Sequence, residues 1–306
     1  MPAASAIETI SAVAWGIRRR VLENTLRNGG GYLSQACSSA EILATLYSGV
    51  MNIGPVAEPL VPPPFAGVPS TGNTGYRLGN AYNGPRQRIL DRFVLSPTHY
   101  SQVLYAALIE TGRLDPSAMQ EFNRDGSSVE MIGAEHSPGM EVMTGSLGQG
   151  LSQAIGMAYG RRLKQEPGLM WLFMSDGEFQ IGMVWEAFQF MSHYEMDSIG
   201  VYVDVNRQQC DGAMSSVMRI DPLAEKLESF GATVVSVDGH DAQALLDAGR
   251  TQHPGKPLVV LCQTDPCRGV AELRKLGGKL HYVRIKNDAE RRRFEDVLAT
   301  FNMGIA

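Results

Sequence analysis

The feature that most constrains the fold is a regular alternation of short apolar runs and amphipathic segments in the second half of the chain. Strands are expected at 169–174, 199–205, 232–237 and 257–263, and helices at about 145–163, 181–195, 221–230 and 241–250. Strands that alternate with helices in this way form a parallel sheet covered by helices. The sequence therefore predicts the α/β class, a parallel sheet flanked by helices, with ligands bound beyond the carboxyl ends of the strands.

The first half of the chain predicts two helices. Apolar positions recur at helical spacing over residues 5–27. A second helix is expected from about Ser38, because Ser38 and Glu41 have the spacing of a capping box. We interpret the run of three arginines at 18–20 as a solvated face of the first helix.

Residues 54–86 differ from the rest of the chain in composition and periodicity. They hold seven prolines and several glycines without any periodicity, which predicts a long loop. Loops of this length are usually functional or disordered. We treat residues 1–306 as a single domain that carries this loop.

Composition narrows the range of partners and compartments. The net charge is −5, so the chain lacks the basic surface that a nucleic-acid-binding protein needs. No stretch approaches the length of about eighteen apolar residues that a membrane span requires. The four cysteines are scattered and the N-terminus lacks the pattern of a secretory signal, so we expect a cytoplasmic protein.

Polar side chains follow two consecutive predicted strands. Asp176 comes directly after the strand at 169–174, and Asn206 directly after the strand at 199–205. If these strands are adjacent and parallel, both side chains emerge at the same edge of the sheet. A carboxylate and a carboxamide oxygen are hard ligands that suit Mg²⁺ or Ca²⁺, and Gly177 lets backbone N–H groups approach a phosphate. An Asp-Gly pair after a strand is common, so this pattern alone is a weak signal.

Longer segments make the signal specific. The run SDGEFQIGMVWEA followed by VDVNRQQCDG resembles the thiamine-diphosphate fingerprint of the transketolase family. Three further segments resemble the same family in the same order: GGYLSQACSSAEILATLY (30–47), DRFVLSPTHYSQVLYAAL (91–108) and PGMEVMTGSLGQGLSQAIGMA (138–158). The chain thus resembles the N-terminal, diphosphate-binding subunit of a split transketolase, which implies a thiamine-diphosphate-binding fold.

The resemblance implies a role for each matching residue. Asp176 and Asn206 would bind Mg²⁺ or Ca²⁺ through their side chains, and Gln208 through its backbone carbonyl. His99 and His281 would be catalytic. The residues implied to bind thiamine diphosphate are His99, Gly145, Ser146, Leu147, Asp176, Gly177, Glu178 and Asn206.

Four positions depart from the family pattern, the first being Ser175, which stands where the family has the first glycine of its Gly-Asp-Gly motif. Tyr32 stands where transketolases usually have a histidine, and Ile181 stands where they have a glutamate that links two active sites. The histidine of the family's Gly-His-Pro segment has no clear counterpart, although His136 lies nearby and substitutes for it if the loop rearranges. Because such histidines transfer protons and contact substrate hydroxyls, their loss implies an altered substrate or weakened activity on ordinary sugar phosphates.

The resemblance covers only the diphosphate-binding domain of a transketolase. It therefore implies a separate C-terminal subunit with the pyrimidine domain, active sites at the interface and a two-plus-two hetero-oligomer. The implied reaction is transfer of a two-carbon glycolaldehyde unit from a ketose, a sugar or sugar phosphate, to an aldehyde. Two alternatives remain open at this stage: the α subunit of a 2-oxo-acid decarboxylase or dehydrogenase, and a non-catalytic regulatory subunit.

Overall fold

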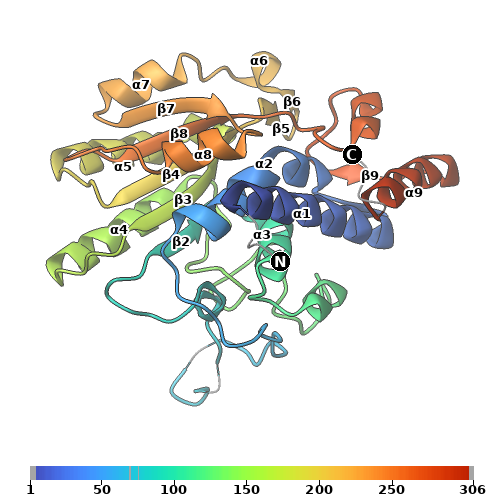
Figure 1. The fold of residues 1–306 in the computed structure, drawn as a ribbon, viewed down its shortest axis with the longest axis horizontal. Helices are drawn as coiled ribbons and strands as arrows, with labels where there is room; N and C mark the ends of the chain where they lie inside the picture. Colours follow the sequence, from blue (N-terminus) through green and yellow to red (C-terminus); the bar gives the residue numbers. More distant parts are fainter. Residues whose placement is uncertain (1–4, 69, 75, 303–306) are drawn as a thin grey trace.

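The computed structural model describes residues 5–68, 70–74 and 76–302, and its centre is a parallel sheet of five strands (Figure 1). The strands lie in the order β2-β3-β4-β8-β7, and every neighbouring pair is parallel. Their bounds are β2 Arg92–Leu95, β3 Met170–Ser175, β4 Ile199–Val205, β7 Thr233–Asp238 and β8 Leu258–Gln263. This arrangement confirms the predicted fold class.

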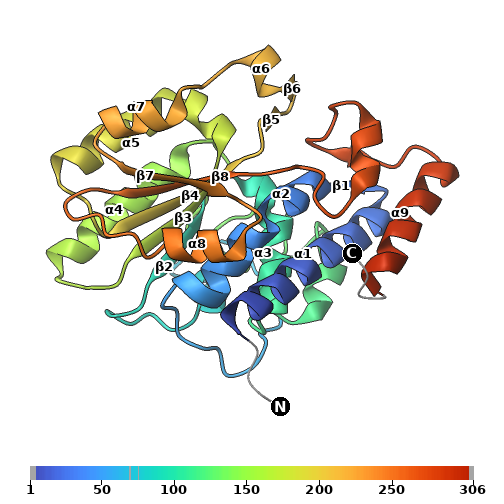
Figure 2. The ribbon, with the colours of Figure 1, turned by 45° about the horizontal axis from the view of Figure 1, so that its top comes forward.

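Helices cover both faces of the sheet (Figures 1 and 2). One face carries α1 (Ala6–Asn28), α2 (Leu33–Thr45), α3 (Ser101–Glu110) and α8 (Ala242–Ala248), and the other carries α4 (Gln149–Leu163), α5 (Gly182–His193) and α7 (Leu223–Ser229). Successive side chains of a strand point to opposite faces. Trp171 and Phe173 of β3 accordingly join the first helical layer, whereas Leu172 and Met174 join the second. The sheet is thus buried on both sides, which explains its unbroken apolar strands.

Smaller elements complete the described chain. They are β1 (Gly30–Gly31) paired with β9 (Val283–Arg284), the hairpin β5 (Gln208–Gln209) and β6 (Gly212–Ala213), and the helices α6 (Met214–Val217) and α9 (Asp288–Asn302). A π-helical turn lies at Leu46–Val50, and 3-10 turns lie at Gly79–Asn83, Thr98–Tyr100, Pro116–Gln120, Asp176–Gln180 and Ala271–Leu276. Among the described residues, no helix is long and apolar enough to cross a membrane.

The predicted start of the second helix is wrong. Helix α2 begins at Leu33, so Ser38 and Glu41 lie inside it and do not cap it. The Ser38 hydroxyl donates to the side chain of Asp204 at 2.5 Å and lies 3.2 Å from the Gln35 carbonyl. The spacing that imitates a capping box therefore serves tertiary contacts.

The three arginines at 18–20 are not a uniformly solvated face, which corrects the sequence-based interpretation. Arg18 is buried and forms an ion pair of 2.5 Å with Glu41 of α2, and its guanidinium also donates to the carbonyl of Cys37. Arg20 pairs with Glu110 of α3. The arginines thus tie α1 to the two helices beside it.

The described residues of the segment 54–86 contain a single short helix, Gly79–Asn83, and otherwise follow an irregular path. This loop packs on the segment that precedes α4. The backbone N–H of Phe65 donates to the Gly126 carbonyl at 2.8 Å, and that of Gly79 donates to the Glu135 carbonyl at 2.7 Å. The assignment of residues 1–306 to a single domain remains a prediction.

Candidate active site

Asp176 and Asn206 emerge side by side at the carboxyl edge of the sheet. Ser175 of β3 is in register with Asp204 of β4, so the residues that follow lie at neighbouring strand ends. Both side chains line a cavity of about 410 Å³. The same cavity brings together most of the predicted site residues, namely His99, Gly145, Leu147, Asp176, Gly177, Asn206, Gln208 and His281. Ser146 and Glu178 do not line it.

Asp176 is a buried carboxylate without a cation. It is 1% exposed, and its Oδ2 accepts the backbone N–H of Arg207 at 2.8 Å. Burial and then the charge of Asp204 raise the pKa of Asp176 to about 8, although the backbone N–H groups of Arg207 and Gly177 and the charge of Arg207 act in the opposite direction. No lysine or arginine lines the cavity, and within the described chain Asp176 has no ion-pair partner. A cation from outside would relieve this unfavourable burial.

The donor atoms around Asp176 suit a hard divalent cation. The Oδ1 atom of Asn206 accepts the backbone N–H of Gln208 at 2.9 Å, which leaves one lone pair of this oxygen for a metal. The buried Oε1 atoms of Gln208 and Gln209 have no hydrogen-bond partner in the described structure. The described residues contain no group of three His, Cys, Asp or Glu side chains that could hold a metal. A carboxylate with carbonyl-type oxygens, completed by phosphate and water, matches the preference of Mg²⁺ or Ca²⁺.

An aromatic cluster forms the other wall of the cavity. The ring of Tyr32 lies 5.7 Å from that of His99 and 5.6 Å from that of His281, and the two imidazoles are 5.0 Å apart, measured between centroids. Burial, and then His281, lower the pKa of His99 to about 3. Burial also lowers the pKa of His281 and raises that of Tyr32. These three side chains are therefore neutral near pH 7 and can exchange protons or bind hydroxyl groups.

Comparison with known proteins identifies the family of this chain. Residues 78–281 match the family described as "Transketolase, thiamine diphosphate binding domain". The chain belongs to the transketolase family. It is 33% identical over 275 residues to a transketolase family protein, y4mO, of Sinorhizobium fredii, and the match covers 88% of each chain.

Two other relatives differ in length. The chain is 30% identical over 258 residues to the 6-deoxy-6-sulfo-D-fructose transketolase subunit SqwG of Clostridium sp. (strain MSTE9), covering 83% of this chain and 84% of SqwG. It is 31% identical over 275 residues to human transketolase-like protein 2, covering 89% of this chain and 40% of the human protein. The chain thus spans less than half of the longer relative.

A solved structure shares the fold. Transketolase from Campylobacter jejuni matches with a TM-score of 0.69 and 18% identity, covering 97% of this chain and 47% of that one. The predicted family resemblance is confirmed, together with the thiamine-diphosphate-binding fold.

Glu178 of this transketolase-family chain lies behind the cavity wall. It is fully buried, and burial raises its pKa. Its carboxylate accepts the hydroxyl of Ser96 at 2.5 Å and the backbone N–H groups of Gly148 and Ser175 at 2.9 Å each. Glu178 therefore joins the ends of β2 and β3 to the start of α4, and its predicted contact with the cofactor remains untested.

His136 does not line the cavity. Its ring packs tilted against that of Phe65 in the long loop, with 4.5 Å between centroids, and its Nε2 lies 3.1 Å from the carboxylate of Glu130. In this arrangement His136 contacts the loop, and a role near the substrate would need the loop to rearrange.

Sequence reasoning missed Asp204 and Tyr100. Asp204 is buried near the end of β4, and the hydroxyl of Tyr100 bonds its carboxylate at 2.8 Å. The available signal was an acidic residue inside an otherwise apolar strand, two positions before Asn206. A buried charge at such a place needs an explanation.

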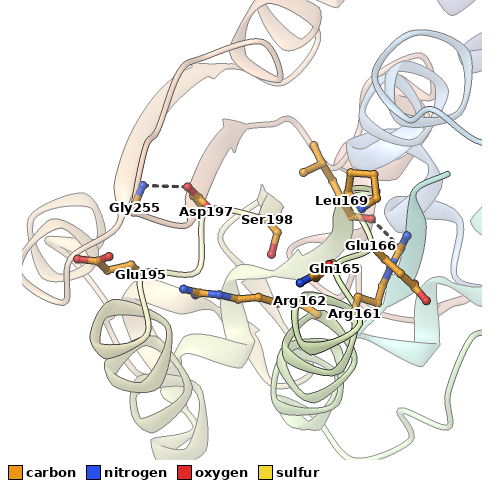
Figure 3. A pocket seen from close by; sticks show the side chains of 12 residues that line it. Arg161, Arg162, Gln165, Glu166, Leu169, Glu195, Asp197, Ser198 and Gly255 are labelled. Carbon is orange, nitrogen blue, oxygen red and sulfur yellow. Dashed lines mark hydrogen bonds and ion pairs between the residues drawn. The ribbon is translucent and has the colours of Figure 1, made fainter. Parts of the chain in front are cut away.

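A larger cavity, of about 510 Å³, lies at the opposite edge of the sheet (Figure 3). Its arginines and Asp197 have partners within the fold. Arg161 pairs with Glu166 at 3.1 Å, the side chain of Asp197 accepts the Gly255 N–H at 3.1 Å, and Arg162 donates to the Tyr194 carbonyl. Size therefore does not identify the active site, whereas the unpaired carboxylate of Asp176 does.

Proposed function

We propose that this chain is the diphosphate- and metal-binding half of a thiamine-diphosphate-dependent transketolase. The proposed reaction moves a two-carbon glycolaldehyde unit from a ketose, a sugar or sugar phosphate, to an aldehyde acceptor. The observation that carries the proposal is the pair Asp176 and Asn206 at adjacent strand ends, in a cavity that no lysine or arginine lines. A family membership that covers most of the chain supports it.

Each part of the cavity has a proposed task. Asp176, Asn206 and the Gln208 carbonyl hold Mg²⁺ or Ca²⁺, which neutralises a diphosphate that no lysine or arginine of the lining could meet. When bound, thiamine diphosphate supplies the nucleophilic carbon that allows a carbon–carbon bond beside a ketone to break. Gly177, Gly145, Ser146, Leu147 and Glu178 form or support its binding surface. His99 and His281, both neutral, accept and return protons at substrate hydroxyl groups.

We further propose a partner chain that completes the site. The relative SqwG is itself a transketolase subunit, and the match covers 84% of its length. Ile132, Leu147 and Val217 line the cavity and are 43–49% exposed, so apolar surface at its rim is available to a second chain. The partner would carry the pyrimidine domain in a two-plus-two assembly. We place the protein in the cytoplasm because its four cysteines are all unpaired thiols.

The test is a transfer assay with the purified chain and its candidate partner. Thiamine diphosphate, Mg²⁺ and a panel of ketose donors are supplied, and Asp176→Ala is the control. Two-carbon transfer that requires both chains and is lost in the variant supports the proposal. Cofactor binding without transfer, combined with release of CO₂ from a 2-oxo acid, would favour decarboxylase chemistry. A pair that assembles without binding the cofactor would favour a regulatory subunit.

A further inference from the structure

Asp204 is a buried carboxylate that does not line the cavity and has no ion-pair partner in the described chain. Four side chains donate hydrogen bonds to it from four parts of the fold. They are Ser38 of α2 at 2.5 Å, Tyr100 before α3 at 2.8 Å, Thr264 after β8 at 2.5 Å and Asn206 after β4 at 3.0 Å. A carboxylate held by this many donors has a fixed orientation.

These contacts determine how the carboxamide of Asn206 is turned. The backbone N–H of Gln208 can only donate, so the atom that it meets at 2.9 Å is the Asn206 oxygen. The nitrogen therefore lies on the opposite side, where it donates to Asp204 and to the Tyr100 hydroxyl, each at 3.0 Å. Tyr100 can accept this bond because its own proton is given to Asp204. Both N–H groups are used, and one lone pair of the oxygen stays free.

We propose that Tyr100 and Asp204 are positioning residues that keep the Asn206 oxygen turned toward a divalent cation. The proposal rests on the proposed function, because it concerns the metal of that same site. Without these two acceptors, nothing on the buried side of the carboxamide favours its nitrogen over its oxygen. It can then turn by a half rotation and present N–H groups, which do not bind a cation. Ser38 and Thr264 act one step further out, by fixing the carboxylate of Asp204.

The network differs from an ordinary buried hydrogen-bond cluster in where it ends. Three of its donors meet Oδ2 of Asp204 and Thr264 meets Oδ1, and its last member, Asn206, reaches the cavity wall. Tyr105 offers a matched comparison in the same helical layer. It is also fully buried, but its hydroxyl donates to the Glu130 carbonyl and touches neither Asp176 nor Asn206.

The experiment measures Mn²⁺ binding to the full chain in the presence of pyrophosphate, by the loss of the free-ion signal in electron paramagnetic resonance. Tyr100→Phe is expected to weaken Mn²⁺ binding by about 10–100-fold, the range found when an outer partner of a metal ligand is removed. Asp204→Asn is expected to act in the same direction. Tyr105→Phe, which removes an equally buried hydroxyl, is expected to bind Mn²⁺ as the wild type does.

Metal-free thermal unfolding separates positioning from stability. Tyr100→Phe and Tyr105→Phe are expected to lower the midpoint by similar amounts, while Mn²⁺ affinity changes in the first alone. Equal Mn²⁺ affinity in both variants, with binding lost in Asp176→Ala, would overturn the positioning role and leave the proposed metal site intact. A wild-type chain that binds no Mn²⁺, or Asp176→Ala that binds it as tightly as wild type, would overturn the metal site and the positioning role together.

Discussion

Two buried carboxylates in this molecule have opposite properties. Burial alone would raise the pKa of Glu41, but a hydrogen bond from His240 and the charge of Arg18 outweigh it and lower the pKa to about 2. Arg18 lies 2.5 Å from this carboxylate and the Nδ1 of His240 lies 3.1 Å from it. Asp176 is buried as well, but it has only backbone N–H partners, and burial together with Asp204 raises its pKa to about 8.

The two carboxylates differ in whether a cationic side chain of the fold pairs with them. Glu41 is neutralised inside the fold and joins α1, α2 and the segment after β7, so it is part of the architecture. Asp176 lies at the open edge of the sheet, where no cationic side chain pairs with it and the charge of Arg207 lowers its pKa by less than burial raises it. A buried acid that the fold does not neutralise is poised for an ion from outside, and strongly perturbed acids of this kind gather at functional sites. The comparison therefore separates a structural acid from a functional one.

The largest expected effect is on stability at the structural acid. Glu41→Gln removes the negative charge and leaves the guanidinium of Arg18 buried without a counter-charge. Breaking a buried pair in this way costs about 3–5 kcal/mol of unfolding free energy. Urea unfolding at pH 7 measures the loss. Glu121→Gln is the control, because its pair with Arg124 is more than half exposed and contributes about 0–1 kcal/mol. Equal losses in the two variants would contradict the assignment of Glu41.

The functional acid should behave in the opposite way. Asp176→Asn is expected to leave metal-free stability unchanged or increased, since a carboxyl with a pKa of about 8 is mostly protonated at pH 7 and a neutral amide mimics it. The stabilisation that Mg²⁺ and thiamine diphosphate give to the assembled protein is expected to need at least about 100-fold more ligand. Thermal unfolding with and without the ligands measures both. A destabilisation as large as that of Glu41→Gln would contradict the distinction between Asp176 as a functional acid and Glu41 as a structural one.

The sequence predicted the sheet better than the helices that support the site. The strands β3 and β4 are apolar on both faces, so their pattern is unambiguous, and both were placed within one residue of their bounds. Strand β2 was missed because it has four residues and no pattern of its own. The start of α2 was misplaced because Ser38 and Glu41 bond Asp204 and Arg18, partners that lie far away in the sequence or on another helix.

The sequence likewise predicted some features of the site and not others. The proximity of Asp176 and Asn206 followed from the strand order, because neighbouring parallel strands end at one edge. The inward turn of Glu178 toward Ser96 did not follow, since it depends on where β2 and the start of α4 lie in space. Likewise, no spacing could show that Tyr32 would meet His281, which is separated from it by most of the chain.

Acidification should remove the stabilisation that the Glu41 carboxylate gives to the fold. The pKa of Glu41 in the folded state, about 2, lies below its usual value of 4.5, so its contribution to stability is complete above about pH 4.5 and is lost as the pH falls toward 2. The gap in unfolding free energy between wild type and Glu41→Gln is expected to be constant from pH 5 to pH 8. It should shrink by about 2 kcal/mol at pH 3, at roughly 1.4 kcal/mol per unit. A gap that widens on acidification would refute the assignment.

The smallest expected effect extends the comparison from acids to hydroxyl groups. The Tyr47 hydroxyl bonds the Asn83 side chain at 2.8 Å inside the core, whereas the Tyr32 hydroxyl forms no hydrogen bond within the described structure and faces the cavity. Tyr47→Phe should therefore lower the unfolding free energy by about 1 kcal/mol, and Tyr32→Phe should leave it unchanged. If the free hydroxyl contacts substrate, Tyr32→Phe lowers kcat/KM of the assembled enzyme by about fivefold, since it removes a hydrogen bond of about 1 kcal/mol. If Tyr32→Phe loses stability while its kinetics stay unchanged, the Tyr32 hydroxyl has a structural role. It then resembles the Glu41 carboxylate, which is bound within the fold.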